Sequence, residues 1–180
     1  EVLPRGVCGA LLAWWILACP ASAVAVEVRA GLWTADGPVY ALALDRNAGV
    51  LYIGGEFGRV GPADPLAGPA VDRRNLAAFD LDSGEVTAWD PAADGPVHAM
   101  WLNPNGTTLY VGGDFAAAGG QFRQRLAALD TTLGLPGTWN PGADGPVRTM
   151  LPSASNGTLY IGGEFTRVAG AERHGLAELG

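Results

Sequence analysis

The chain has 180 residues, enough for one domain of ordinary size, and its 48% apolar and 16% charged content argues against a disordered protein. The net charge is −7 and all 11 basic residues are scattered arginines, which argues against a nucleic-acid-binding face and against adhesion to an anionic membrane. The 27 glycines and 13 prolines favour frequent turns, and therefore many short strands rather than long helices.

Residues 1–25 resemble a secretory signal peptide. Arg5 supplies a positive start, an apolar run follows, and small residues then permit cleavage after Ala23 or after Ala25. The apolar run is shorter than the roughly 20 residues that a membrane span needs, so cleavage is favoured over an uncleaved anchor. We therefore predict a secreted or cell-envelope protein whose mature part, residues 26–180, is not inserted in a membrane.

Both cysteines, Cys8 and Cys19, lie inside this signal. The mature chain then contains no thiol, which excludes disulfides, CxxC redox motifs and thiolate metal sites from it. One alternative stays open, because the segment that ends at Cys19 loosely resembles a lipoprotein box in which this cysteine becomes the lipidated first residue. Leu17 and Pro20 fit that box poorly.

Self-comparison reveals a unit of 50 residues that occurs nearly three times. The first copy is 58 residues long because it carries eight additional residues in a Gly/Pro-rich stretch, as a surface loop tolerates. The third copy stops 13 residues short of a full period, so we expect further copies beyond Gly180. The copies span residues 36–93, 94–143 and 144–180.

Each copy divides into four short predicted strands, as the second copy illustrates. They cover residues 97–102, 108–115 and 126–130, and a fourth passes through Thr138-Trp139. An Asn-Gly dipeptide between the first two favours a type I′ hairpin turn. Four strands in about 50 residues is the scale of a β-propeller blade, and strands apolar on both faces suit blades packed between neighbours. We predict an all-β fold of four-stranded antiparallel propeller blades, in an incomplete ring of about three.

Three sets of residues recur with the repeat and are predicted to be structural. A Gly-Gly pair ends the second strand, where glycine permits a bulge or a close backbone approach. In the Asp-Gly-Pro motif, the glycine is expected to take a positive φ and the aspartate to cap the turn through a local Asx bond. A tryptophan before each later copy is a large apolar anchor whose indole N–H needs a partner between blades. These residues are Gly54, Gly55, Gly112, Gly113, Gly162 and Gly163 for the pairs, Asp36, Asp94 and Asp144 for the turn, and Trp89 and Trp139 for the anchors.

The order of these motifs resembles that of the delta-60 repeat, a bacterial β-propeller repeat of unknown function. The motifs are Trp-x-Pro-x-x-Asp-Gly-Pro-Val, then Leu-Tyr-(Ile/Val)-Gly-Gly-acid-Phe, then Leu-Ala. The chain is also similar to the propeller of fungal cortical cell-polarity markers. The resemblance covers residues 33–180 and implies a secreted or surface propeller, often within a much larger protein, and it brings no catalytic residues. The eight-residue insertion is a departure from it.

An acidic residue follows each glycine pair, and we call a set of equivalent positions in the three repeats a column. Glu56, Asp114 and Glu164 would form a ring that binds a cation, or would accept backbone N–H bonds as structural acids. The structural interpretation is favoured, because one column lacks the roughly six to eight oxygen ligands that Ca²⁺ takes. His98 and His174 stand in columns whose other members differ, so a shared metal or catalytic role is not expected. The sequence contains no nucleotide-binding, zinc or catalytic-triad motif, and no cofactor is expected.

These features predict a structural or interaction module without catalytic activity in this segment, which presents rim loops to a protein or glycan. The loop over residues 58–73 is the expected specialised contact because the other copies lack its insertion. No nucleic acid is expected as a partner, whereas the remaining blades of a longer chain are. The alternative is the N-terminal part of a propeller-based extracellular enzyme whose catalytic residues lie beyond Gly180.

Overall fold

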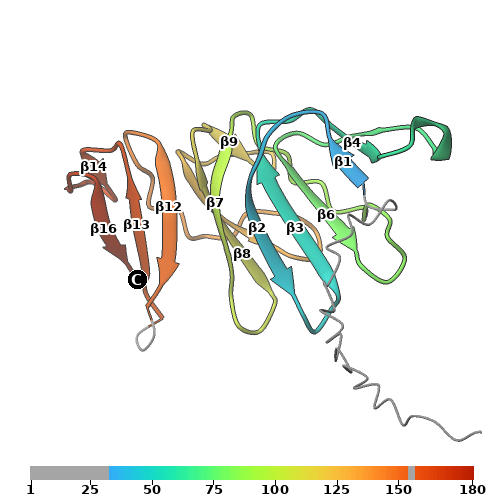
Figure 1. Cartoon of the computed structure of the whole chain (residues 1–180). Helices are drawn as coiled ribbons and strands as arrows, with labels where there is room; N and C mark the ends of the chain where they lie inside the picture. Colours follow the sequence, from blue (N-terminus) through green and yellow to red (C-terminus); the bar gives the residue numbers. More distant parts are fainter. Residues whose placement is uncertain (1–32, 154–156) are drawn as a thin grey trace, which may run out of the picture.

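The computed structural model describes residues 33–153 and 157–180 (Figure 1). The signal predicted at residues 1–25, with both cysteines, lies outside these ranges. The described part of the chain consists of β-strands and one short 3-10 helix, η1 (Pro65–Ala67), in the inserted loop. It contains no helix that is both long enough and apolar enough to cross a membrane. The prediction of an all-β fold is therefore confirmed.

Three antiparallel sheets, one from each repeat, form the body of the molecule. In each sheet the second strand of the repeat lies in the middle and pairs with the first and third. Figure 1 shows the sheets following one another in an open row, with their first strands β2, β7 and β12 adjacent. Sheet 1 consists of β2 (Val39–Asp45), β3 (Val50–Gly55) and β6 (Leu76–Asp80), sheet 2 of β7 (Val97–Leu102), β8 (Thr108–Gly113) and β11 (Leu126–Asp130), and sheet 3 of β12 (Val147–Pro152), β13 (Leu159–Gly163) and β16 (Leu176–Leu179).

The fourth predicted strand shrinks to a single bridge. Val86 bridges Phe79 in sheet 1, and Pro136 bridges Leu129 in sheet 2. The prediction of a strand through Thr138-Trp139 is wrong, because this segment leaves the sheet immediately after the bridge. In sheet 2 the proline has no N–H with which to extend the ladder. All three sheets are therefore three-stranded, and sheets 1 and 2 have one bridged residue in place of a fourth strand.

A smaller hairpin accompanies each sheet. In repeats 2 and 3 it is a pair of two-residue strands, and a bridge ties it to the segment arriving from the preceding repeat, from Ala93 to Ala118 and from Ala143 to Val168. In repeat 1 the insertion makes the hairpin longer, and a third strand replaces the bridge. The strands are β1 (Trp33–Ala35), β4 (Arg59–Pro62) and β5 (Val71–Asp72) in repeat 1, β9 (Ala117–Ala118) and β10 (Gln121–Phe122) in repeat 2, and β14 (Arg167–Val168) and β15 (Ala171–Glu172) in repeat 3.

The apolar core lies between neighbouring sheets, where the first glycine of each pair makes room for the next repeat. A Cβ on Gly54 would lie 2.8 Å from both Val97 Cγ1 and Met100 Sδ of sheet 2. A Cβ on Gly112 would lie 2.8 Å from Val147 Cγ1 of sheet 3. Both valines are 0% exposed. Close packing of this kind leaves no room for a side chain in place of the glycine.

Two tryptophans fix neighbouring sheets to each other. The ring of Trp89 packs edge-on against Tyr52 of its own repeat, with centroids 5.1 Å apart. Its Nε1 donates to the carbonyl oxygen of Asp130 in the next repeat at 3.0 Å, which satisfies the buried indole N–H. Trp139 makes the same edge-on pair with Tyr110, also at 5.1 Å. Trp139 is partly buried and packs against the core of repeat 3, so both tryptophans lie between neighbouring sheets, and Trp89 also bonds to the next repeat through its indole N–H.

The turn between β7 and β8 differs from the predicted type I′ turn. The N–H of Gly106 donates to the carbonyl oxygen of Asn103 at 3.0 Å, so Pro104 and Asn105 are the central residues. A type I′ turn needs positive φ at both central residues, whereas neither of these has it. The proline ring fixes φ near −65°, and only the following Gly106 takes a positive φ, of 73°. The prediction of a turn at Asn-Gly is therefore confirmed, and the prediction of its type is wrong.

Candidate functional site

The second glycine of each pair creates the geometry of the site. A Cβ on Gly55, Gly113 or Gly163 would lie 2.1 Å from the carbonyl oxygen of the proline in the facing Asp-Gly-Pro-Val motif. Only glycine permits this approach of two backbones. The N–H of the acid that follows the glycine then donates to the same proline carbonyl at 2.8 Å, in all three repeats.

This close approach coincides with a β-bulge at the start of each first strand. The pairing register shifts between Val39 and Ala41, and at the equivalent places in sheets 2 and 3. The residue left out of the pairing is Tyr40, His98 or Arg148. A bulge re-aims its extra side chain away from the regular alternation of the strand. Each repeat thus presents one side chain that takes no part in the ladder.

The three bulge side chains meet in one line across the sheets. The rings of Tyr40 and His98 have centroids 5.0 Å apart, and Arg148 Nη1 lies 2.6 Å from His98 Nε2. Two acids of the predicted column accept hydrogen bonds at the two ends of this line. Tyr40 Oη donates to Glu56 Oε2 at 3.1 Å, and Arg148 Nε donates to Glu164 Oε1 at 2.9 Å. We call these five residues the bulge row. Three repeats contribute to it, and its hydrogen bonds and ring contact run continuously from Glu56 to Glu164.

The bulge row has a defined charge pattern at neutral pH. Partial burial lowers the pKa of His98, and the nearby Arg148 lowers it further. His98 is therefore neutral at pH 7, and its Nε2 accepts a hydrogen bond from the guanidinium of Arg148, with the tautomer assigned from this contact. The hydrogen bond to Glu56 raises the pKa of Tyr40, so the phenol stays protonated and donates. Tyr40 is nevertheless 46% exposed, which leaves part of its ring accessible to a ligand.

The acid column is divided among different partners. Glu56 and Glu164 belong to the bulge row, whereas Asp114 Oδ1 lies 3.4 Å from Arg125 Nε. All three carboxylates lie at the surface. Over residues 33–153 and 157–180, the structure brings no three His, Cys, Asp or Glu side chains into an arrangement that would hold a metal ion. The column therefore has the geometry of separate salt bridges and hydrogen bonds rather than of a coordination shell.

The aspartates of the Asp-Gly-Pro motif bind a distant turn instead of their own. Asp36 Oδ1 accepts the N–H groups of Gly58 and Arg59 at 2.8 and 3.0 Å, and Asp94 and Asp144 do the same in their repeats. The prediction of a local Asx bond is wrong, because these partners lie 22 and 23 residues further along the chain. Hydrogen bonds lower the pKa of Asp144 to about 2, above all the one from the Thr166 hydroxyl.

The glycine of the same motif has a different role from the one predicted. None of the three has a positive φ. A Cβ on Gly37 would instead lie 2.1 Å from the carbonyl oxygen of Glu56, and the equivalent distances are 2.2 Å for Gly95 and 2.3 Å for Gly145. The expectation of a left-handed turn is therefore wrong, and the physical reason for glycine is a second close approach of two backbones, directly beside the bulge.

Sequence reasoning missed a buried arginine that supports the hairpins. Arg123 is 8% exposed, and its Nη2 donates to the carbonyl oxygen of Gly137 at 2.8 Å. Arg73 makes the equivalent bond to Thr87 at 2.8 Å. Both arginines connect a hairpin strand to the segment that follows the third strand of the sheet. The signal in the sequence is an arginine that recurs at the repeat period, at 73, 123 and 173.

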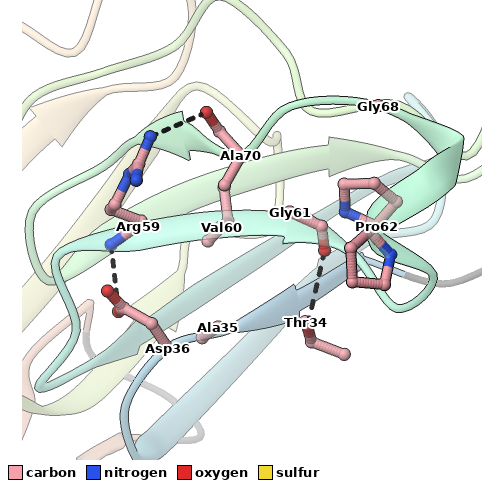
Figure 2. A pocket seen from close by; sticks show the side chains of 10 residues that line it. Thr34, Ala35, Asp36, Arg59, Val60, Gly61, Pro62, Gly68 and Ala70 are labelled. Carbon is pink, nitrogen blue, oxygen red and sulfur yellow. Dashed lines mark hydrogen bonds between the residues drawn. The ribbon is translucent and has the colours of Figure 1, made fainter.

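The insertion forms a shallow groove beside β4. Figure 2 shows Asp36 and Thr34 below this strand and Ala70 and Gly68 above it. The groove has a volume of about 320 Å³. Its one cation, Arg59, is already engaged: Nε lies 2.9 Å from Asp72 Oδ1, and Nη2 donates to the carbonyl oxygen of Ala70 at 3.3 Å. The groove is therefore lined mainly by apolar residues, and the bulge row is the more polar of the two candidate binding sites.

Comparison with known proteins gives no relative from which a function can be transferred. No protein family matches the chain, and no curated protein matches it either.

Proposed function

We propose that the chain is part of a secreted or cell-envelope β-propeller of the delta-60 type, and that it acts as a non-catalytic scaffold that binds a protein or glycan through the bulge row. The three sheets would be its blades, and further blades of a longer chain would continue the row. No cofactor and no nucleic acid enters this proposal. The signal-like residues 1–25, with Cys19 as a lipidation point in one alternative, support the location.

One observation carries the proposal: the residues that form the bulge are the same in the three repeats, whereas the side chain presented at the bulge differs among them. Val39, Val97 and Val147 precede the bulge, and the same glycines and aspartates surround it in all three repeats. The bulge position itself changes from tyrosine to histidine to arginine. Because a bulge residue does not pair in the ladder, its side chain can change in type without disturbing the pairing of the strands. Recognition sites on rigid scaffolds have this division between constant frame and variable contacts.

The chemistry of the row suits a polar ligand. An exposed tyrosine face provides apolar contact, and the Glu56 and Glu164 carboxylates retain free lone pairs for hydroxyl or amide donors. The histidines have other partners in the described part of the chain: His98 contacts Arg148, and His174 contacts Glu172. We assign a catalytic step to neither.

A binding screen of the full chain tests the proposal. The purified protein is applied to an array of glycans and of extracellular peptides, and each hit is measured by calorimetry. Tyr40→Ala and Arg148→Ala are expected to weaken binding at least about tenfold, because each removes a side chain that would touch the ligand. Phe122→Ala is the matched control, since Phe122 is 66% exposed and lies outside the row. Equal binding by all four proteins would overturn the assignment of the row.

A further inference from the structure

His98 occupies the middle of the bulge row, where it connects repeat 2 to repeat 3. Its Nε2 lies 2.6 Å from Arg148 Nη1. Arg148 also binds Glu164 through Nε and Nη2, each 2.9 Å from Oε1. A guanidinium has only donors, so the contact between the two repeats exists because the imidazole nitrogen accepts.

Protonation of His98 reverses this role. In an imidazolium both ring nitrogens are donors, so Nε2 would present an N–H group to the guanidinium of Arg148. Two positive charges in direct contact also repel each other. The hydrogen bond between these side chains therefore lasts only while His98 is neutral.

The groups that face His98 determine how readily it takes up a proton. Partial burial opposes the positive charge most, and Arg148 on β12 opposes it next, so the pKa of His98 lies below its ordinary value. Three carboxylates favour the charge, but each of them already has another partner. The carboxylates are Asp114 after β8, Glu56 after β3 and Glu164 after β13, and their partners are Arg125, Tyr40 and Arg148. The neutral imidazole therefore stabilises the fold, and this stabilisation is lost as the pH falls through the folded pKa.

We propose that the bulge row is a pH-sensitive device, in which one proton taken up at His98 Nε2 ends the contact with Arg148 and weakens ligand binding. The effect on binding rests on the proposed function, whereas the loss of contact concerns the chain alone. The frame stays in place, because His98 takes no part in the ladder and the neighbouring Val97 is 0% exposed. Glu164 still holds Arg148, so the row divides between repeats 2 and 3 while the sheets keep their packing.

NMR of the full chain without ligand tests the loss of contact. Between about pH 8 and pH 4, the Arg148 Nε resonance of the wild type is expected to shift with the same midpoint as the His98 ring protons. His98→Gln is the matched variant, because its amide oxygen can accept from Arg148 but does not titrate. It keeps every carboxylate of the row and is expected to lose this shift.

His174→Gln is the control, since it removes the histidine that lies 2.9 Å from Glu172 and is expected to keep the Arg148 response. An Arg148 midpoint that differs from that of His98, or an equal shift in His98→Gln, would overturn the device.

Calorimetry tests the effect on binding, with the tightest-binding glycan or peptide from the array as the probe. One pH unit below the His98 midpoint, about a tenth of the molecules keep the neutral imidazole, so the wild-type dissociation constant is expected to rise about tenfold. That of His98→Gln is expected to change less than about twofold. Unchanged or tighter wild-type binding would overturn the regulatory role and leave the row as a ligand site. An array without a hit contradicts the proposed function instead, and NMR still decides whether the proton ends the contact.

Discussion

The close approach beside the bulge makes Gly113→Ala the most informative single substitution. The new Cβ would lie 2.1 Å from the carbonyl oxygen of Pro96, and 3.0 Å from both its carbonyl carbon and Val97 Cα. All three atoms belong to the backbone, so no flexible side chain can move aside. Overpacking costs about 1–3 kcal/mol where side chains adjust, and we expect at least the upper end here. A loss of about 3 kcal/mol is a large share of the roughly 5–15 kcal/mol by which proteins are stable.

The matched control is Gly137→Ala. A Cβ there meets only the carbonyl oxygen of Ala128, at an ordinary 3.8 Å, and the glycine has no positive φ. We expect it to be neutral or slightly stabilising, because alanine restricts the unfolded chain. Urea unfolding of both variants, followed by tryptophan fluorescence, gives the two free energies. If Gly113→Ala falls within about 0.5 kcal/mol of Gly137→Ala, the proposed backbone contact does not set the bulge.

Three further predictions concern single side chains. Trp89→Phe keeps an aromatic ring but loses the bond to the Asp130 carbonyl, and is expected to lower the unfolding free energy by about 1–3 kcal/mol in urea; no loss would show that this bond is dispensable. The folded pKa of Asp144, about 2, lies below its unfolded value, so its ionised form stabilises the fold above about pH 4 and this stabilisation disappears as the pH falls through about 2. The difference in melting temperature between wild type and Asp144→Asn should therefore be present at pH 7 and shrink towards pH 2; a constant difference would contradict the assignment. In NMR titrations, His98 should titrate below its ordinary value and move upwards in Arg148→Gln; an unchanged pKa would show that the two groups are not coupled.

The repeat predicted both ends of the first and third strands of the second copy because local signals mark them, whereas the second strand, predicted over 108–115, ends at Gly113. The strand over 97–102 begins after Asp-Gly-Pro and ends before Asn103, and β7 has these bounds. The third strand, over 126–130, also has the bounds of β11. The prediction of a fourth strand is wrong because a single-residue bridge, and not a ladder of pairs, follows the third strand. Its apolar residues serve packing between sheets, which a periodicity argument cannot separate from strand pairing.

The candidate site was beyond the reach of local patterns. The acids Glu56 and Glu164 recur next to the glycine pairs and are therefore visible in the sequence, whereas their partners at the bulge do not recur. Tyr40, His98 and Arg148 differ from one another, and a comparison of repeats that looks for constancy discards such a column. Their convergence depends on three bulges that lie side by side, which only the packing of the sheets brings about. The close backbone approach was predicted for the Gly-Gly pairs, whereas for the Asp-Gly-Pro glycines the sequence predicted a positive φ where the structure has a second close approach.

The bulge separates what the chain must keep from what it is free to change. An ordinary strand residue serves its neighbours, and its replacement disturbs the pairing on either side. A residue outside the ladder can be replaced without disturbing the pairing. Each tandem duplication therefore adds one position where mutation changes the surface side chain while the sheets keep their structure. An engineer would randomise these three sites together and select new binders, and evolution has the same route whenever the array gains or loses a unit.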